Sequence, residues 1–305
     1  MAFELTEQTK VAVLMGGVAA EREVSLRSGK AVTAALKAQG IDATGVDVSS
    51  LQQLENIAQE YDVAFVALHG RWGEDGTVQA ILQDLKMPFT GSRMQASAIA
   101  MDKLRTKWMW LGAGLPTPNF VRVNSQNPLN MQTFDLEFPV IVKPIHEGSS
   151  IGMQKVESRE KLAAAVAEAQ VFDDEVLIEQ WITGREYTAA VLNDKALPLI
   201  ELRTNNSFYD FEAKYQSNDT QYICPTDLAP EMEQSLQKIV LQAFDVVGSQ
   251  TWGRVDLMLD EQNRPWLIEL NSVPGMTDHS LVPMAAKQAG ISFEELVKQI
   301  LITAS

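Results

Sequence analysis

The feature that most constrains the fold is a pair of apolar runs joined by a polar stretch near the end of the chain. Residues 254–259 and 266–271 flank the polar residues 260–264, which predicts a β-hairpin. If the turn is centred between Gln262 and Asn263, Asp256 lies opposite Glu269 and Arg254 lies opposite Asn271. The period of two along each strand then places all four of these side chains on one face.

Two carboxylates and an amide on one face of an apolar hairpin repel one another and are costly to bury unaided. A cation that prefers oxygen ligands removes this cost, and Mg²⁺ commonly takes a few carboxylates together with phosphate oxygens. The pattern therefore predicts a metal site formed by Asp256, Glu269 and Asn271. The alternative is an ordinary hairpin whose polar face meets water, with Arg254 pairing the carboxylates.

The first hundred residues alternate strands with helices. Residues 11–15 predict a buried strand followed by a Gly-Gly turn, and Ser25 is predicted to cap a helix that ends at Gly40. Residues 62–68 predict a second apolar strand that ends at His69. This order indicates a parallel sheet, and ligands bind at the carboxyl ends of such strands.

Two further sections follow, so the sequence predicts three domains, over residues 1–100, 101–184 and 185–305. The second is predicted to contain a helix over 102–111, a strand over 139–143, a helix over 159–169 and a strand over 176–181. The third is predicted to contain strands over 187–192 and 197–202, a helix over 231–247, the hairpin and a final helix over 293–300. A polar stretch over 204–226 interrupts it and is the candidate for a lid that excludes water.

Several single residues carry a functional and a structural interpretation. Lys143 ends an apolar strand before a Gly-Ser loop that suits a phosphate, but a solvated lysine before a turn looks the same. Glu179 lies inside an apolar strand, where it can bind a nucleoside or simply face solvent. Glu21 can hold a substrate ammonium, yet a glutamate in a first helical turn is favourable by itself. A lone histidine such as His69 is more often structural than catalytic.

Composition excludes several classes of function. The 305 residues carry a net charge of −15, which repels nucleic acid and anionic lipid. One cysteine cannot form an intrachain disulfide, and the first ten residues do not read as a secretory signal. No apolar stretch is long enough to span a bilayer. We therefore expect a cytoplasmic protein whose partners are small molecules, without nucleic acid or membrane.

Nine groups of short motifs follow one another along nearly the whole chain. Their residues and their order together resemble the ATP-grasp superfamily, specifically the D-alanine–D-alanine ligase family. The motifs are Gly16-Gly17 with residues 20–25, Leu68-His69-Gly70 with residues 73–76, Met101-Asp102-Lys103, residues 142–144, 147–150, 212–215 and 253–256, Glu269-Leu270-Asn271 with Pro274-Gly275-Met276, and residues 279–283. Each motif is weak alone, whereas the ordered set is specific.

The resemblance implies an α/β ATP-grasp architecture, in which an N-terminal parallel-sheet domain precedes two α+β domains that enclose ATP. The residues that it assigns to ATP are Lys103, Lys143 and Lys214 for the phosphates, and Glu179, Trp181 and Glu186 for adenine and ribose. Those assigned to the amino acids and the reaction are Glu21 for the first ammonium, Ser149 and Tyr215 beside it, Arg254 and Gly275 for the oxyanion, Ser280 and Leu281 for the second carboxylate, and His69 nearby. Those assigned to two Mg²⁺ ions, which Mn²⁺ can replace, are Asp256, Glu269 and Asn271.

The implied reaction joins two D-alanine molecules through a D-alanyl-phosphate for peptidoglycan precursor synthesis, and the resemblance also implies a homodimer. Two alternatives stay open: a related ligase that uses D-lactate or D-serine as second substrate, and a non-catalytic nucleotide-binding protein. Tyr215 argues against the first alternative, and the set of lysines and metal ligands argues against the second. A dehydrogenase is disfavoured because no GxGxxG follows the first strand. Gln180 replaces a lysine that many relatives carry, and Arg71 receives no role.

Overall fold

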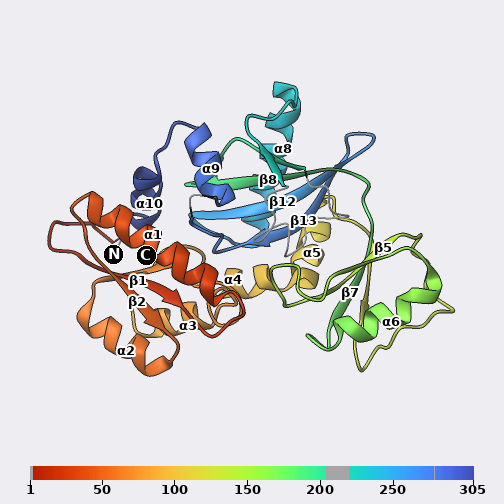
Figure 1. The fold of residues 1–305 in the computed structure, drawn as a ribbon, viewed down its shortest axis with the longest axis horizontal. Helices are drawn as coiled ribbons and strands as arrows, with labels where there is room; N and C mark the ends of the chain where they lie inside the picture. Colours follow the sequence, from red (N-terminus) through yellow and green to blue (C-terminus); the bar gives the residue numbers. More distant parts are fainter. Residues whose placement is uncertain (1–2, 204–219, 278) are drawn as a thin grey trace.

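The computed structural model describes residues 3–203, 220–277 and 279–305, which form three α/β units (Figure 1). In the first unit, β1 (Lys10–Gly16) lies between β2 (Asp42–Val48) and β3 (Val63–Val66), and all three strands are parallel. Its helices are α1 (Arg22–Ala38), α2 (Leu51–Glu60) and α3 (Thr77–Asp84). The strand-helix alternation of this region therefore predicted the parallel sheet correctly.

The helix after the first strand starts earlier than the sequence predicted. It begins at Arg22 with Glu21 as its N-cap residue, so the prediction that Ser25 caps it is wrong. The Ser25 hydroxyl accepts a hydrogen bond from the Gly16 backbone N–H at 2.9 Å and donates one to the Ala67 carbonyl at 2.7 Å. This serine joins the ends of two strands, and its hydroxyl is thereby engaged outside the helix.

The second unit is an antiparallel sheet covered by one helix. Its strand order is β4 (Phe120–Val123), β7 (Val176–Gln180), β5 (Val140–Pro144) and β6 (Gln154–Val156). Helix α6 (Arg159–Ala169) packs its apolar side chains against β5 and β7, forming a core of its own. Helices α4 (Met94–Met101) and α5 (Lys103–Gly112) connect this unit to the first (Figure 1).

The third unit is a larger antiparallel sheet. Its strands are β11 (Gln221–Ile223), β10 (Ile200–Arg203), β8 (Gly184–Leu192), β12 (Trp252–Asp260) and β13 (Pro265–Asn271), in that order, with β9 (Lys195–Ala196) beside β8. Helix α8 (Pro230–Val246) covers one face, where Leu236, Val240 and Phe244 pack on the sheet. The described strands at 200–203 and 221–223 flank residues 204–219.

The end of the chain returns to the first unit. Helices α9 (Leu281–Gln288) and α10 (Phe293–Leu301) share the core of the parallel sheet, and α10 lies beside α1 (Figure 1). The side-chain amide of Gln39 donates to the Glu294 carbonyl at 2.8 Å, and Ser305 pairs with Phe89 through the backbone. Packing therefore groups residues 281–305 with the first unit, whereas the boundaries at residues 100 and 184 stay a prediction. Within the described ranges, no helix combines the length and the apolar character needed to cross a membrane.

Candidate active site

A cavity of about 1600 Å³ lies where the three units meet. The predicted site residues that line it are Glu21, His69, Lys103, Ser149, Arg254, Glu269, Asn271, Gly275, Ser280 and Leu281. Residues that the sequence separates by more than 200 positions are thus brought together. Lys143, Glu179, Trp181, Glu186 and Asp256 lie outside its lining, and Lys214 and Tyr215 lie outside the described residues, as does most of the predicted lid.

The hairpin pairs its polar residues as predicted, although its turn differs. Asp256 lies opposite Glu269 and Arg254 opposite Asn271. Nearer the turn, Leu259 pairs with Pro265, so the turn is one residue shorter than the symmetric turn assumed from the sequence. The extra residue is Ile268, which forms a β-bulge and restores the predicted register at the polar positions.

The polar side chains of this hairpin are joined by hydrogen bonds. The Arg254 guanidinium donates to both carboxylate oxygens of Asp256, with Nε at 2.8 Å from Oδ1 and Nη2 at 2.7 Å from Oδ2. The Asn271 amide donates to Asp256 Oδ2 at 3.2 Å, and the Thr188 hydroxyl donates to Oδ1 at 2.5 Å. Asp256 is therefore held by three groups, and this pairing with Arg254 is also what the alternative interpretation of the hairpin expected.

The hairpin offers only oxygen donors to a metal ion. Over the ranges that the structure describes, no three His, Cys, Asp or Glu side chains are grouped to hold a metal. The candidate set is instead two carboxylates and one amide, of which Glu269 and Asn271 face the cavity. Such a set suits a hard cation that completes its coordination with phosphate oxygens and water.

Lys143 and Glu179 belong to a buried cluster that also contains Lys107. The Glu179 carboxylate forms ion pairs with both ammonium groups, and all three side chains are almost completely buried. Burial lowers the pKa of Lys107 to about 8. Burial also opposes the ionisation of Glu179, but the two lysines hold its pKa below the usual value. Both oxygens of Glu179 are thus engaged, and its contact with a nucleoside stays a prediction.

Lys107 is a residue that the sequence interpretation missed. It lies on α5 four positions after Lys103, and this spacing places both ammonium groups on the same side of the helix. Lys103 contacts the Gly-Ser loop, where its ammonium donates to the Glu147 carbonyl at 2.5 Å. The spacing of these two lysines was the available signal.

Trp181 and Glu186 lie outside the lining of the main cavity. Trp181 follows β7 and lines a separate cavity of about 180 Å³, where the Lys155 ammonium lies 4.6 Å from its ring centroid. Glu186 lies in β8 and is paired with Met258 of β12. Their roles toward adenine and ribose stay predictions.

Glu21 is enclosed by two backbone segments from different units. A Cβ atom at Gly70 would lie 2.3 Å from Glu21 Oε2, and one at Gly148 would lie 2.8 Å from Oε1. Any side chain at either position would therefore displace the carboxylate. Ser149 lines the cavity next to Gly148 and has a backbone φ of 53°, in the left-handed region. Glycines in both motifs are explained by this close approach to Glu21.

His69 is a neutral imidazole that connects two segments of the site. Burial lowers its pKa to about 4. Its Nδ1 lies 2.9 Å from the Val273 carbonyl and therefore carries the proton, so Nε2 accepts from the Ser28 hydroxyl at 3.2 Å. The same hydroxyl accepts from the Met276 backbone N–H at 3.1 Å. His69 thus positions the loop that contains Gly275.

Glu74 is a second residue that received no role from the sequence. It lines the cavity, and Gly70 donates its backbone N–H to Glu74 Oε1 at 3.0 Å. Burial raises the pKa of Glu74 to about 8, which favours the protonated carboxyl at neutral pH. The Gly-Glu-Asp-Gly motif around Glu74 was the available signal, although only the fold reveals the burial.

Gly275 and the start of α9 form the opposite wall. Ser280 is the N-cap residue of α9, and its hydroxyl lies 2.9 Å from both the backbone nitrogen and the hydroxyl of Thr277. A Cβ atom at Gly275 would lie 2.9 Å from this hydroxyl, so the backbone approaches closely. Backbone N–H groups at a helix N-terminus favour a carboxylate, which agrees with the position predicted for Ser280 and Leu281.

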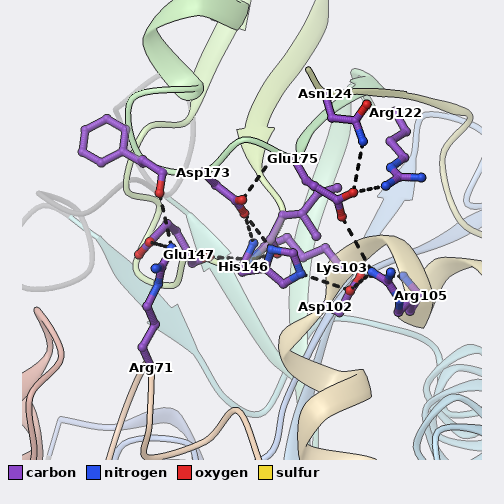
Figure 2. A network of polar contacts seen from close by, with 12 residues as sticks. Arg71, Asp102, Lys103, Arg105, Arg122, Asn124, His146, Glu147, Asp173 and Glu175 are labelled. Atoms are coloured by element: carbon purple, nitrogen blue, oxygen red, sulfur yellow. Dashed lines mark hydrogen bonds and ion pairs between the residues drawn. The ribbon is translucent and has the colours of Figure 1, made fainter. Parts of the chain in front are cut away.

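The Gly-Ser loop is fixed by a polar network that surrounds His146 (Figure 2). The imidazole lies 2.8 Å from Asp173 Oδ2 through Nδ1 and 3.1 Å from Asp102 Oδ2 through Nε2. Hydrogen bonds to Asp102 and to Asp173 raise the pKa of His146 to about 9. Asp102 also caps α5 by accepting from the Arg105 backbone N–H at 2.8 Å. The network therefore connects the loop to the start of the helix that carries Lys103.

A parallel α/β unit followed by two α+β units, with lysines and a carboxylate hairpin at their junction, is the ATP-grasp architecture. The family models for the D-ala D-ala ligase N-terminus and C-terminus match residues 47–92 and 109–302. A D-alanine–D-alanine ligase of Hydrogenovibrio crunogenus is 65% identical over 96% of this chain and 93% of its own. The chain belongs to the D-alanine–D-alanine ligase family.

Solved structures agree with this assignment. The ATP complex of D-alanine–D-alanine ligase from Bacillus anthracis has a TM-score of 0.87 at 32% identity and covers 97% of each chain. The VanG D-Ala:D-Ser ligase from Enterococcus faecalis has a TM-score of 0.86 at 26% identity, covering 96% of this chain and 98% of its own. The ATP-grasp fold predicted from the sequence is thereby confirmed.

Proposed function

We propose that this chain joins two D-alanine molecules to D-alanyl-D-alanine with ATP, through a D-alanyl-phosphate, as a step of peptidoglycan precursor synthesis. The observation that carries the proposal is the convergence of Glu21, Arg254, Glu269 and Ser280 on one cavity. These residues supply an anion for an ammonium, a cation for an oxyanion, a metal ligand and a helix N-terminus for a carboxylate. Membership of the family supports the same reaction.

The reaction begins when a carboxylate oxygen of the first D-alanine attacks the γ-phosphorus of ATP and ADP leaves. Glu21 binds the ammonium of this D-alanine, and Ser149 lies beside it on the Gly-Ser loop. Lys103 and Lys143 bind the phosphates, and Lys214 acts with them. Glu179, Trp181 and Glu186 bind adenine and ribose. Glu179 also forms an ion pair with Lys143 and so positions an ammonium group that binds phosphate.

The second D-alanine then enters as a free amine. Its nitrogen attacks the carbonyl carbon of the acyl-phosphate, and the tetrahedral intermediate expels phosphate, which takes up the proton that the nitrogen loses. Arg254 and the Gly275 N–H stabilise the oxyanion of this intermediate. The second carboxylate binds at Ser280 and Leu281, while His69 positions the Gly275 loop and Tyr215 closes the pocket.

Asp256, Glu269 and Asn271 would hold two Mg²⁺ ions, or Mn²⁺ in their place. When bound, the ions neutralise charge on the transferring phosphoryl group. The oxygen-only donor set supports this assignment, as does the exposure of Glu269 and Asn271 to the cavity. Arg254 holds Asp256 in position before a ligand arrives.

The chain would act in the cytoplasm as a homodimer, with ATP and D-alanine as its small-molecule partners. Second substrates other than D-alanine are less well supported. The relative named as a D-Ala:D-Ser ligase is 26% identical, whereas the relative named as a D-alanine–D-alanine ligase is 65% identical. The intact set of charged residues in the cavity also disfavours a non-catalytic nucleotide-binding protein.

Phosphate release from ATP tests the proposal. The purified chain is given Mg²⁺ with D-alanine alone, with D-alanine plus D-serine, or with D-alanine plus D-lactate, and the products are identified by mass spectrometry. We expect phosphate release and D-alanyl-D-alanine with D-alanine alone. Equal or faster formation of the mixed product would reassign the second substrate, and absence of phosphate release in every mixture would refute the ligase activity.

A further inference from the structure

Arg71 connects the first unit to the second. It follows His69-Gly70 at the end of the parallel sheet, and its side chain reaches the Gly-Ser loop (Figure 2). Arg71 Nη2 lies 2.5 Å from Glu147 Oε1 and donates to the Phe172 carbonyl at 3.3 Å. One guanidinium therefore contacts two segments of the central unit.

The ion pair is half-enclosed by protein. The Arg71 side chain is 54% exposed, whereas that of Glu147 is only 16% exposed. A carboxylate with so little access to water depends on its partner more than a surface carboxylate does. Loss of Arg71 would leave Glu147 without the cation it contacts.

The two partners stand next to the two glycines that enclose Glu21. Arg71 follows Gly70, Glu147 precedes Gly148, and each glycine approaches one oxygen of the Glu21 carboxylate. The separation of these two backbone segments therefore sets the space around Glu21. An ion pair between the adjoining residues fixes this separation.

The central end of the contact also has partners within its own unit. The Glu147 carbonyl accepts from the Lys103 ammonium at 2.5 Å. The neighbouring His146 is held by Asp102 and Asp173, and Phe172 adjoins Asp173. Arg71 thus adds a contact from the first unit to a segment that the central unit holds on its other side.

We propose that the Arg71–Glu147 ion pair positions the first-substrate site by holding the Gly70 and Gly148 backbones on either side of Glu21. The proposal deepens the proposed function and rests on it. Arg71 is a positioning residue, because it acts on Glu21 through the two loops. It contributes to binding of the first amino acid and leaves the phosphate sites unchanged.

The test compares Arg71→Ala, Glu147→Gln, the double variant and the exchanged pair Arg71→Glu with Glu147→Arg. Arg159→Ala is the control, because the Arg159 guanidinium likewise donates to the backbone of the central unit, through the Met131 and Phe134 carbonyls, but lies on α6 outside the cavity lining. The readouts are KM for D-alanine at its first site, KM for ATP, kcat and hydrogen exchange of the amides of residues 145–152.

We expect Arg71→Ala to raise the first-site KM about fivefold, the upper range for a partly exposed ion pair, with kcat and the KM for ATP within about twofold. Glu147→Gln should act alike, the double variant should add little, and the exchanged pair should recover part of the loss. Amides of residues 145–152 should exchange faster in Arg71→Ala than in Arg159→Ala. An unchanged first-site KM, or independent additive effects of the two substitutions, would overturn the proposal.

Hydrogen exchange separates this proposal from the proposed function. If the wild-type chain forms no D-alanyl-D-alanine, the ligase assignment fails by itself. Exchange that is equally slow in Arg71→Ala and wild type would show that the ion pair does not fix the loop, whatever reaction the chain catalyses.

Discussion

Replacement of His146 by glutamine tests whether a protonated imidazole holds the Gly-Ser loop. Glutamine keeps hydrogen-bonding groups but cannot carry the positive charge that lies between Asp102 and Asp173. The pKa of His146 is raised from 6.5 to about 9 in the folded chain, mainly by its hydrogen bond to Asp102 and next by that to Asp173. The folded state therefore binds a proton more tightly than the unfolded state does.

The size of the effect follows from this pKa difference. At about 1.4 kcal/mol per pKa unit, the rise from 6.5 to about 9 corresponds to at most about 3–4 kcal/mol of stability. The imidazole is 36% exposed, and solvent screening reduces this figure to about 1–2 kcal/mol. Because the folded pKa is raised, this stability is fully present below pH 6.5 and is lost as the pH rises through about 9.

Urea unfolding of wild type and His146→Gln at pH 6 and pH 10 measures the difference. We expect wild type to exceed the variant by about 1–2 kcal/mol at pH 6 and by much less at pH 10. Arg105→Gln is the control, because Arg105 also contacts Asp102 but keeps its charge at both pH values. A difference for His146→Gln that is equally large at pH 10 would refute the reasoning.

Three further changes have distinct expected outcomes. Arg254→Ala should lower kcat about 10²–10³-fold with little change in the KM for ATP, because Arg254 faces charge that develops after the amine attacks. Steady-state kinetics that placed the loss on the KM for ATP would contradict this. The double variant Asp256→Ala, Glu269→Ala should lose activity and Mn²⁺ binding, and full turnover would exclude the metal site. The pKa of Glu74 is about 8, raised mainly by burial, so wild type should lose stability between pH 4.5 and pH 8 in urea unfolding without ligands. Glu74→Gln should not show this loss of stability. A pH profile of unfolding free energy identical to that of wild type would contradict the prediction.

The sequence was most informative where side chains follow a period. Alternation in the hairpin predicted that Asp256 and Glu269 face each other, and the structure agrees. The same reasoning misplaced the turn, because a bulge leaves no signature in a period-two pattern until one strand is compared with the other. Ser25 was misassigned for a related reason, since a serine near a helix start looks like a cap until its tertiary partners are known.

Contacts between units were beyond sequence reasoning. Lys107 and Glu179 form an ion pair although 72 positions separate them in the sequence, and Arg71 and Glu147 do so although they are 76 positions apart. Charged residues on a helix and in a loop are ordinarily solvated, so their sequence context does not single them out. Burial of Glu74 is likewise a product of the fold, because its own segment is polar.

The bulge at Ile268 divides the hairpin into two parts with different tolerance to insertion and deletion. On the outer side, Leu259 and Pro265 follow the turn, so residues added to the turn lengthen a surface loop. On the inner side, β12 is paired without interruption to β8, which fixes Asp256 independently of the turn. Deletion of Ile268 would remove the bulge and leave Glu269 opposite Asp256, because Leu267 and Glu269 already pair with neighbouring residues of β12. Members of the family can therefore differ in the length of this turn while they keep the same carboxylate pair.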